Sequence, residues 1–180
     1  QVAIIGAGVS GLACARQAQA LGAAVTLFDK SRGVGGRAAT RRFDDGTTCD
    51  HGAQYFTARD PDFSRLVTLW ERTGVVKRWL GRIGVYEDGA LTAKSAAVER
   101  WVGVPTMNAF CRQMAEGLAV ERETRIERVE REAAGWRLIA ADGRRFGLFD
   151  RVVSSAPAEQ SAELLLEIDE VQQPLGAIRY

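Results

Sequence analysis

The chain has 180 residues, of which 46% are hydrophobic and 26% are charged, a size and composition typical of one globular domain or slightly more. Its formal net charge is +1 and its basic residues are dispersed, so we expect neither a nucleic acid nor an anionic membrane as a partner. No apolar run approaches the roughly 18 residues that cross a bilayer, and no signal peptide precedes the first predicted strand, so we expect a cytoplasmic protein.

The first predicted elements are a strand, a glycine-rich turn and a helix. An apolar run at residues 2–5 precedes the sequence GAGVSG, and apolar side chains then recur at helical spacing to residue 21. In a dinucleotide site these glycines make the turn, admit the pyrophosphate and let the helix pack on the strand. A helix N-terminus also favours phosphate. An ordinary glycine-rich turn is the less favoured alternative. The predicted cofactor-binding residues here are Gly6, Ala7, Gly8, Val9, Ser10 and Gly11.

A second apolar run at residues 24–28 ends at Asp29, which lies 18 positions beyond Gly11. This is close to the spacing of about 20 residues at which a carboxylate bonds the cofactor's ribose. A second glycine cluster with flanking arginines follows, and its amides and one arginine could reach the same phosphates. Because NAD sites usually lack this second cluster, it favours FAD. The predicted cofactor-binding residues in this segment are Asp29, Lys30, Arg32, Gly35, Gly36 and Arg37.

The middle of the chain predicts a helix that begins after Asp60 with Pro61 in its first turn and stops at Gly74. Strands are expected at residues 75–80 and 83–86, with a turn at 87–89 before Ala90 and Leu91, and a further helix at 107–118. Residues 124–129, 136–139 and 145–146 predict a three-stranded meander. Residues 149–155 predict the next parallel strand, and an apolar helix is expected at 164–166.

The three cysteines, Cys14, Cys49 and Cys111, are widely separated and lack metal-site spacing. Cys14 is interpreted as a small buried apolar residue. His51 is the only histidine, so a site with several histidine ligands is impossible and a Ser-His-Asp triad would depend on that residue alone. We therefore expect no metal site.

The two glycine motifs with Asp29 resemble those of the FAD-binding amine-oxidase superfamily. The continuations at residues 38–42, 50–57, 104–107 and 155–157 resemble its renalase-like bacterial branch, and the excess of arginine over lysine also suggests a bacterial source. The resemblance implies an α/β fold: a Rossmann-like FAD-binding domain, with a parallel sheet and a meander, plus part of an inserted α+β substrate domain. The expected division is 1–56 and 106–163 for FAD binding, 57–105 for the insertion and 164–180 for the start of a truncated substrate-domain segment.

Further cofactor contacts follow from this resemblance. In the superfamily the residue at the Ile126 position bonds the adenine through its backbone, although a plain buried strand residue fits equally. The loop after residue 50 has a small backbone flanked by donors, which suits contact with the flavin; an exposed turn is the alternative. Trp79 and Trp101 are interpreted as core rather than as a wall beside the flavin. Arg41 and Arg42 fit an anionic-substrate contact and a solvated strand equally well. The additional predicted cofactor-binding residues are His51, Gly52, Ala53, Gln54, Tyr55, Ile126, Ala156 and Pro157.

Superfamily members also carry a Gly-Asp pair near the C-terminus, whose carboxylate bonds the ribityl chain. This sequence contains no such pair and ends at Tyr180. We expect a fragment, or an incompletely represented chain, that binds FAD through its ADP half but leaves one side of the flavin open. An incomplete family assignment is the other possibility.

The resemblance implies a FAD-dependent oxidase that takes hydride from a small reduced donor onto the flavin N5 and passes the electrons to dioxygen, with formation of hydrogen peroxide. The renalase-like motifs imply a dihydronicotinamide isomer of NAD(P)H as the donor. No catalytic residue is assigned, because direct hydride transfer needs no general base. A flavin amine oxidase or desaturase is one alternative. A non-catalytic nucleotide-binding module or inactive fragment is another. The oligomeric state is not predicted.

Overall fold

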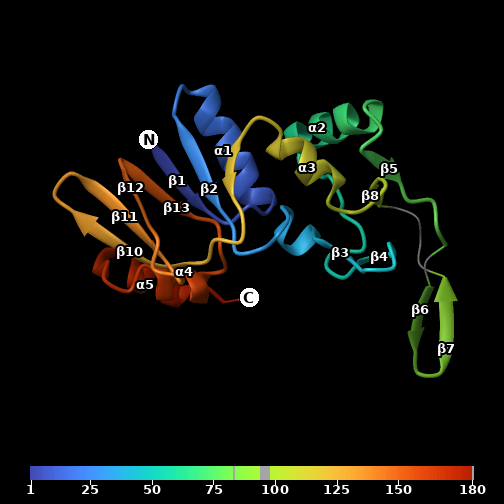
Figure 1. Cartoon of the computed structure of the whole chain (residues 1–180). Coiled ribbons are helices and arrows are strands. Elements are labelled where there is room, and N and C mark those ends of the chain that lie inside the picture. Colours follow the sequence, from blue (N-terminus) through green and yellow to red (C-terminus); the bar gives the residue numbers. More distant parts are fainter. Residues whose placement is uncertain (83, 94–97, 180) are drawn as a thin grey trace. The chain divides into compact units, whose positions relative to one another are not determined.

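The computed structural model describes residues 1–82, 84–93 and 98–179 (Figure 1). The chain forms two compact units: unit 1 consists of Gln1–Gly36 and Met114–Tyr180, and unit 2 of Arg37–Gln113. These boundaries differ from the expected division at residues 56 and 105, and the segment after residue 164 belongs to the same unit as the first strand. The assignment of cofactor and substrate domains to these parts stays a prediction.

Unit 1 is built on a parallel sheet of four strands in the order β13-β1-β2-β9. Strand β1 (Val2–Ile5) lies between β2 (Val25–Phe28) and β13 (Arg151–Ser154), and β9 (Ala119–Glu121) pairs with β2. The mixed α/β fold with a parallel sheet is thus confirmed, including the return of the chain as β13. Strand β9 was not predicted from the sequence.

Helix α1 (Val9–Ala20) packs on β1 and β2, as predicted from the spacing of its apolar residues. Gly11, Leu12 and Ala15 are buried on its inner face. Leu21, which was assigned to the same face, is 78% exposed because it is the C-cap residue and lies beyond the last helical turn. Cys14 is only half-buried, so its interpretation as a buried residue is wrong.

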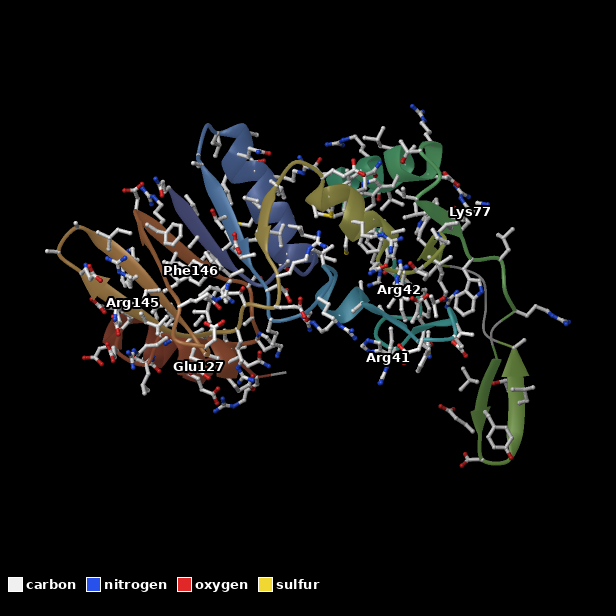
Figure 2. All side chains as sticks on the ribbon, in the orientation of Figure 1. Arg41, Arg42, Lys77, Glu127, Arg145 and Phe146 are labelled. Carbon is white, nitrogen blue, oxygen red and sulfur yellow. The ribbon has the colours of Figure 1, made fainter. Side chains whose placement is uncertain are left out.

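The predicted meander is confirmed. Strands β10 (Ile126–Glu132), β11 (Gly135–Ala140) and β12 (Arg145–Phe149) are antiparallel neighbours. The Phe28 ring of β2 lies 4.9 Å from that of Phe146 and 5.9 Å from that of Phe149, which joins the meander to the core of unit 1. Figure 2 shows Glu127, Arg145 and Phe146 on these strands.

Two helices, α4 (Ala158–Leu164) and α5 (Asp169–Ala177), pack against each other at the end of unit 1. The expected apolar helix at 164–166 is wrong, because α4 ends at Leu164. Three successive leucines cannot share one helix face: Leu164 reaches the core, whereas Leu166 is 69% exposed.

Unit 2 contains helix α2 (Pro61–Arg72) and the first five residues of a short helix, α3 (Ala109–Ala115), whose last two residues belong to unit 1. Asp60 caps α2 as predicted, since its Oδ1 accepts from the amides of Asp62 at 3.0 Å and Phe63 at 2.9 Å. Gly74, in a left-handed conformation (φ +80°), follows the helix end. The expected helix 107–118 is shorter than predicted because Gly117 adopts φ +72°, which stops helical continuation.

The described residues of unit 2 also form three two-stranded sheets. They pair β3 (Thr40–Arg42) with β4 (Thr48–Asp50), β5 (Val76–Arg78) with β8 (Trp101–Gly103), and β6 (Gly84–Glu87) with β7 (Ala90–Ala93). The 3-10 turn η1 (Gly36–Ala38) lies at the unit boundary. The strand expected at 75–80 is shorter than predicted, and residue 83 of the next one lies outside the described residues.

The two tryptophans of this region have different environments. Trp101 is 5% exposed, so its interpretation as core is confirmed, whereas Trp79 is 40% exposed and that interpretation is wrong. Within the described ranges, no helix is both long and apolar enough to cross a membrane. The same residues contain no cluster of three or more His, Cys, Asp or Glu side chains that could hold a metal ion.

Candidate dinucleotide-binding site

The turn after β1 requires glycine at two positions for reasons internal to the chain. Gly6 has φ +104°, and a Cβ there would lie 2.5 Å from Oγ of Ser155. A Cβ on Gly11 would lie 2.0 Å from the carbonyl oxygen of Gly6, so helix α1 can approach the turn only without a side chain at this position. These glycines set the close packing of α1 against the end of β1, as the motif predicts.

Gly8 is different, because the protein itself leaves room for a side chain there. It is the N-cap of α1 with an extended backbone (φ −77°, ψ −179°) that any residue can adopt. A Cβ on Gly8 would have ordinary contacts, the nearest being Cα of Gly36 at 3.7 Å. A ligand close to this backbone is a physical reason for glycine at this position, and a pyrophosphate fits that description.

The N-terminus of α1 carries amides that can receive an anion. The first helical hydrogen bond runs from the Leu12 amide to the Gly8 carbonyl at 2.9 Å, so the amides before Leu12 have no partner within the helix. No side chain in the described part of the chain caps this end. These amides and the positive end of the helix dipole suit phosphate.

Asp29 has a role that sequence reasoning missed. It is 9% exposed at the end of β2, and its carboxylate ties together the two glycine segments. Oδ2 accepts from the Ala7 amide at 2.7 Å, and Oδ1 accepts from the Ser31 amide at 2.8 Å. A carboxylate offers about four acceptor positions, so it can still accept a ribose hydroxyl. The predicted ribose contact stays a prediction beside this structural role.

The structure brings the second glycine cluster against the first. The Gly35 amide donates to the Ala7 carbonyl at 2.9 Å, and Gly8 and Gly35 form a parallel bridge. Gly36, at φ +55°, approaches Gly8 so closely that a Cβ on it would lie 3.1 Å from the Gly8 Cα. The two motifs therefore form one surface of small, glycine-rich backbone.

Two basic side chains, Lys30 and Arg32, lie in the segment between β2 and the second glycine cluster. Lys30 and Arg32 are exposed, and within the described residues neither forms a salt bridge. Their positive charges can therefore offset the negative charge of a pyrophosphate.

The predicted flavin contacts at residues 51–55 belong to unit 2. The Ala53 amide donates to the Arg37 carbonyl at 2.8 Å, and a Cβ on Gly52 would lie 2.1 Å from the same oxygen. The small backbone at Gly52 is therefore explained by the chain's own packing. His51, Gln54 and Tyr55 are exposed, and their contact with a flavin stays a prediction.

Other predicted residues have defined surroundings in unit 1. Ile126 is 6% exposed and its side chain belongs to the core beside the meander, which leaves its predicted backbone contact with adenine untested. Pro157 is the N-cap residue of α4, and the Ala156 carbonyl accepts from Oγ of Ser161 at 3.1 Å.

Arg41 and Arg42 are exposed on β3 (Figure 2). The guanidinium carbon of Arg41 lies 5.3 Å from the centre of the Phe43 ring, a contact that holds the side chain on the strand surface. This arrangement is that of a solvated strand, and a contact of these arginines with an anionic substrate stays a prediction.

Cys111 is fully buried, and its burial raises the pKa of the thiol to about 12. The thiol is therefore protonated at neutral pH and packs as an apolar side chain rather than acting as a nucleophile.

Comparison with known proteins gives the same fold. Residues 4–71, which include both glycine motifs, match the family model of the NAD(P)-binding Rossmann-like domain. Solved structures of similar fold include putrescine oxidase bound to putrescine, at 16% identity with a TM-score of 0.68, covering 91% of this chain and 59% of that one. A putative protoporphyrinogen oxidase from Exiguobacterium sp. 255-15 matches at 15% identity with a TM-score of 0.67, covering 96% and 63%. A fatty acid isomerase from P. acnes that produces CLA matches at 16% identity with a TM-score of 0.73, covering 98% and 63%.

The chain thus spans about three fifths of the length of the solved structures it matches. At these identities the likeness establishes the fold and not the activity. The chain has a mixed α/β architecture with a Rossmann-like fold, and its two glycine motifs lie within the part that matches the NAD(P)-binding Rossmann-like domain.

Proposed function

We propose that this chain binds FAD and forms the cofactor-binding part of a FAD-dependent oxidoreductase. The observation that carries the proposal is the joined surface of the two glycine motifs, where Gly8 has room for a side chain yet carries none. Two of the solved structures with the same fold are named as oxidases, which supports this class of protein.

The residues of unit 1 have distinct tasks in this proposal. The amides at the start of α1, which have no partner within the helix, hold the pyrophosphate, and the exposed Lys30 and Arg32 offset its charge. Asp29 accepts a ribose hydroxyl while it holds the amides of Ala7 and Ser31. When bound, FAD supplies a hydride acceptor that dioxygen can reoxidise.

We further propose a dihydronicotinamide isomer of NAD(P)H as the donor, with dioxygen as the electron acceptor. The support is the renalase-like sequence at residues 38–42 and 50–57. In the overall reaction the donor loses one hydride and becomes a cationic nicotinamide ring. That hydride, together with one proton from solvent, converts dioxygen to hydrogen peroxide.

The donor is tested by anaerobic stopped-flow mixing with the full-length protein. We expect rapid bleaching of the flavin absorbance by dihydronicotinamides that carry the hydride at the 2- or 6-position, and slow bleaching by ordinary NADH. Rapid bleaching by a primary amine or a polyamine, with none by the isomers, would identify an amine oxidase instead. Bleaching by no donor would leave a nucleotide-binding module without this activity.

A further inference from the structure

The hydroxyl of Ser155 lies against the turn after β1, although Ser155 belongs to neither glycine motif. Ser155 follows β13, and its amide donates to the Ile5 carbonyl at 2.9 Å. Its Oγ lies 3.0 Å from the same carbonyl oxygen and 3.1 Å from that of Gly6. Among the described residues no backbone amide donates to the Gly6 carbonyl. The hydroxyl is therefore the donor on which the Gly6 carbonyl depends, whereas Ile5 already has the Ser155 amide.

The peptide group between Gly6 and Ala7 is thus held at both ends. Its carbonyl accepts from the Ser155 hydroxyl, and its amide, which is that of Ala7, donates to Oδ2 of Asp29 at 2.7 Å. The carbonyl and the N–H of a trans peptide point in opposite directions, so the two side chains hold this group from opposite sides. If the peptide turned over, its carbonyl oxygen would face the Asp29 carboxylate, and two acceptors repel each other.

The turn needs such support because it lacks side chains of its own. Gly6 has φ +104° and no Cβ, so sterics restrict its backbone less than that of any other residue. A Cβ on Gly6 would lie 2.5 Å from Oγ of Ser155, and a Cβ on Gly11 would lie 2.8 Å from the same atom. The Ser155 hydroxyl therefore occupies space that side chains of the turn would otherwise fill.

The next peptide group presents an amide to the predicted phosphate position. The Ala7 carbonyl accepts from the Gly35 amide at 2.9 Å, so the Gly8 amide, at the other end of that peptide, points away from Gly35. Gly8 is the N-cap residue of α1, where backbone amides suit a phosphate. Ala7 joins this peptide to the one before it. Rotation of the Gly6–Ala7 peptide would therefore loosen the amide that receives the ligand.

We propose that Ser155 is a positioning residue of the dinucleotide site. Its hydroxyl and the Asp29 carboxylate hold the Gly6–Ala7 peptide from opposite sides, which fixes the amides that receive the pyrophosphate before the ligand binds. This preorganisation raises affinity, because the ligand does not have to order the turn. The identification of the ligand as FAD rests on the proposed function, whereas the role of Ser155 concerns the ADP half that FAD shares with NAD.

The test compares Ser155→Ala with Ser154→Ala in the full-length, cofactor-free protein. Ser154 is the preceding residue and is also half-buried, but its hydroxyl pairs with that of Ser161 on α4 at 2.8 Å. Calorimetric titrations with FAD and with ADP measure binding with and without the flavin. Ser155→Ala should weaken the binding of both ligands by the same factor, roughly 2-fold to 10-fold for one lost hydrogen bond. Ser154→Ala should weaken neither.

Ser155→Cys separates the hydrogen bond from the shape of the side chain. It keeps a side chain of similar shape but replaces the hydroxyl by a weak donor. It should therefore weaken the binding of FAD and ADP as Ser155→Ala does. The thermal midpoint of each variant verifies that the protein is folded.

Amide hydrogen exchange gives a second measurement, which a general loss of stability would not reproduce. In cofactor-free protein with isotopically labelled alanine, the exchange rate of the Ala7 amide reports its bond to Asp29. Ala3, in the middle of β1, is the internal reference for the stability of the sheet. The ratio of the Ala7 rate to the Ala3 rate should rise by roughly 10-fold in Ser155→Ala and stay at the wild-type value in Ser154→Ala.

Four results would overturn the role of Ser155: wild-type ADP affinity in Ser155→Ala or Ser155→Cys, a loss for FAD alone, an equal loss in Ser154→Ala, or an unchanged ratio of exchange rates. Failure of the proposed function is distinguishable from these. Loss of ADP affinity in Ser155→Ala of a protein that binds NAD and not FAD supports the role of Ser155 and removes the proposed function. FAD binding that ignores Ser155 supports the proposed function and removes this role.

Discussion

Alanine at Gly8 and alanine at Gly11 should have opposite effects on stability and on cofactor binding. Gly8 has an extended backbone and its Cβ would meet only ordinary contacts at 3.7 Å or more. A Cβ on Gly11 would instead lie 2.0 Å from the carbonyl oxygen of Gly6, a backbone atom that cannot move away by rotation of a side chain. The two substitutions add the same methyl group a few residues apart in one turn.

The expected magnitudes follow from these contacts. Gly8→Ala should keep the free energy of unfolding of the cofactor-free protein within about 1 kcal/mol of the wild type, because its backbone conformation suits alanine. The methyl group should nevertheless clash with the pyrophosphate and weaken FAD binding by about 1–3 kcal/mol, or roughly 5-fold to 150-fold in Kd. Gly11→Ala should reduce the free energy of unfolding by about 3 kcal/mol or more.

Urea unfolding of the cofactor-free protein gives the first quantity, and calorimetric titration with FAD gives the second. Gly11→Ala shows what damage to the fold alone does to FAD binding. If Gly8→Ala unfolds like the wild type and also binds FAD with the wild-type Kd, the cofactor does not approach this backbone, and the reasoning from the open position at Gly8 is refuted.

Three further predictions follow from individual side chains. Asp29→Ala should weaken FAD binding by about 1.5–3 kcal/mol in calorimetry and also destabilise the cofactor-free protein, since two backbone amides lose their acceptor; unchanged values would place the ribose elsewhere. A hydrogen bond from Arg137 lowers the pKa of Glu132 below its ordinary value of 4.5. The stabilising contribution of the Glu132 carboxylate should therefore be lost as the pH falls below 4.5, and the acid unfolding of Glu132→Gln should depend less on pH in that range. Burial raises the pKa of Cys111 to about 12, so iodoacetamide at pH 8 should modify the exposed Cys49 in the folded protein and leave Cys111 unmodified; equal labelling would contradict the burial.

The start of the fold could be predicted because its signals are local. The apolar run at residues 2–5, the spacing of three glycines and the helical period after them all lie within twenty-one residues. The meander could also be predicted from the sequence, because its strands are consecutive in the chain. Strand β9 could not be found in this way, because three residues carry too little pattern and its pairing with β2 joins distant parts of the chain.

The candidate site was predicted in position but not in its internal contacts. The bond from the Ala7 amide to Asp29 spans 22 residues, and no pattern in the sequence indicates that the predicted ribose ligand also holds the loop. Gly52 was assigned to flavin contact for its small backbone, whereas the Arg37 carbonyl accounts for that feature. Trp79 was assigned to the core because large aromatic side chains are usually buried, whereas it is 40% exposed and its ring lies beside that of Tyr55, 24 residues away in the chain.

The identity of the bound nucleotide tests the central claim most directly. The full-length protein, purified without added cofactor and then denatured, should release FAD in near-equimolar amount, identified by chromatography and by its absorbance spectrum. A colourless protein that binds only NAD or NADP would contradict the proposed function, because the second glycine cluster would then serve a different dinucleotide.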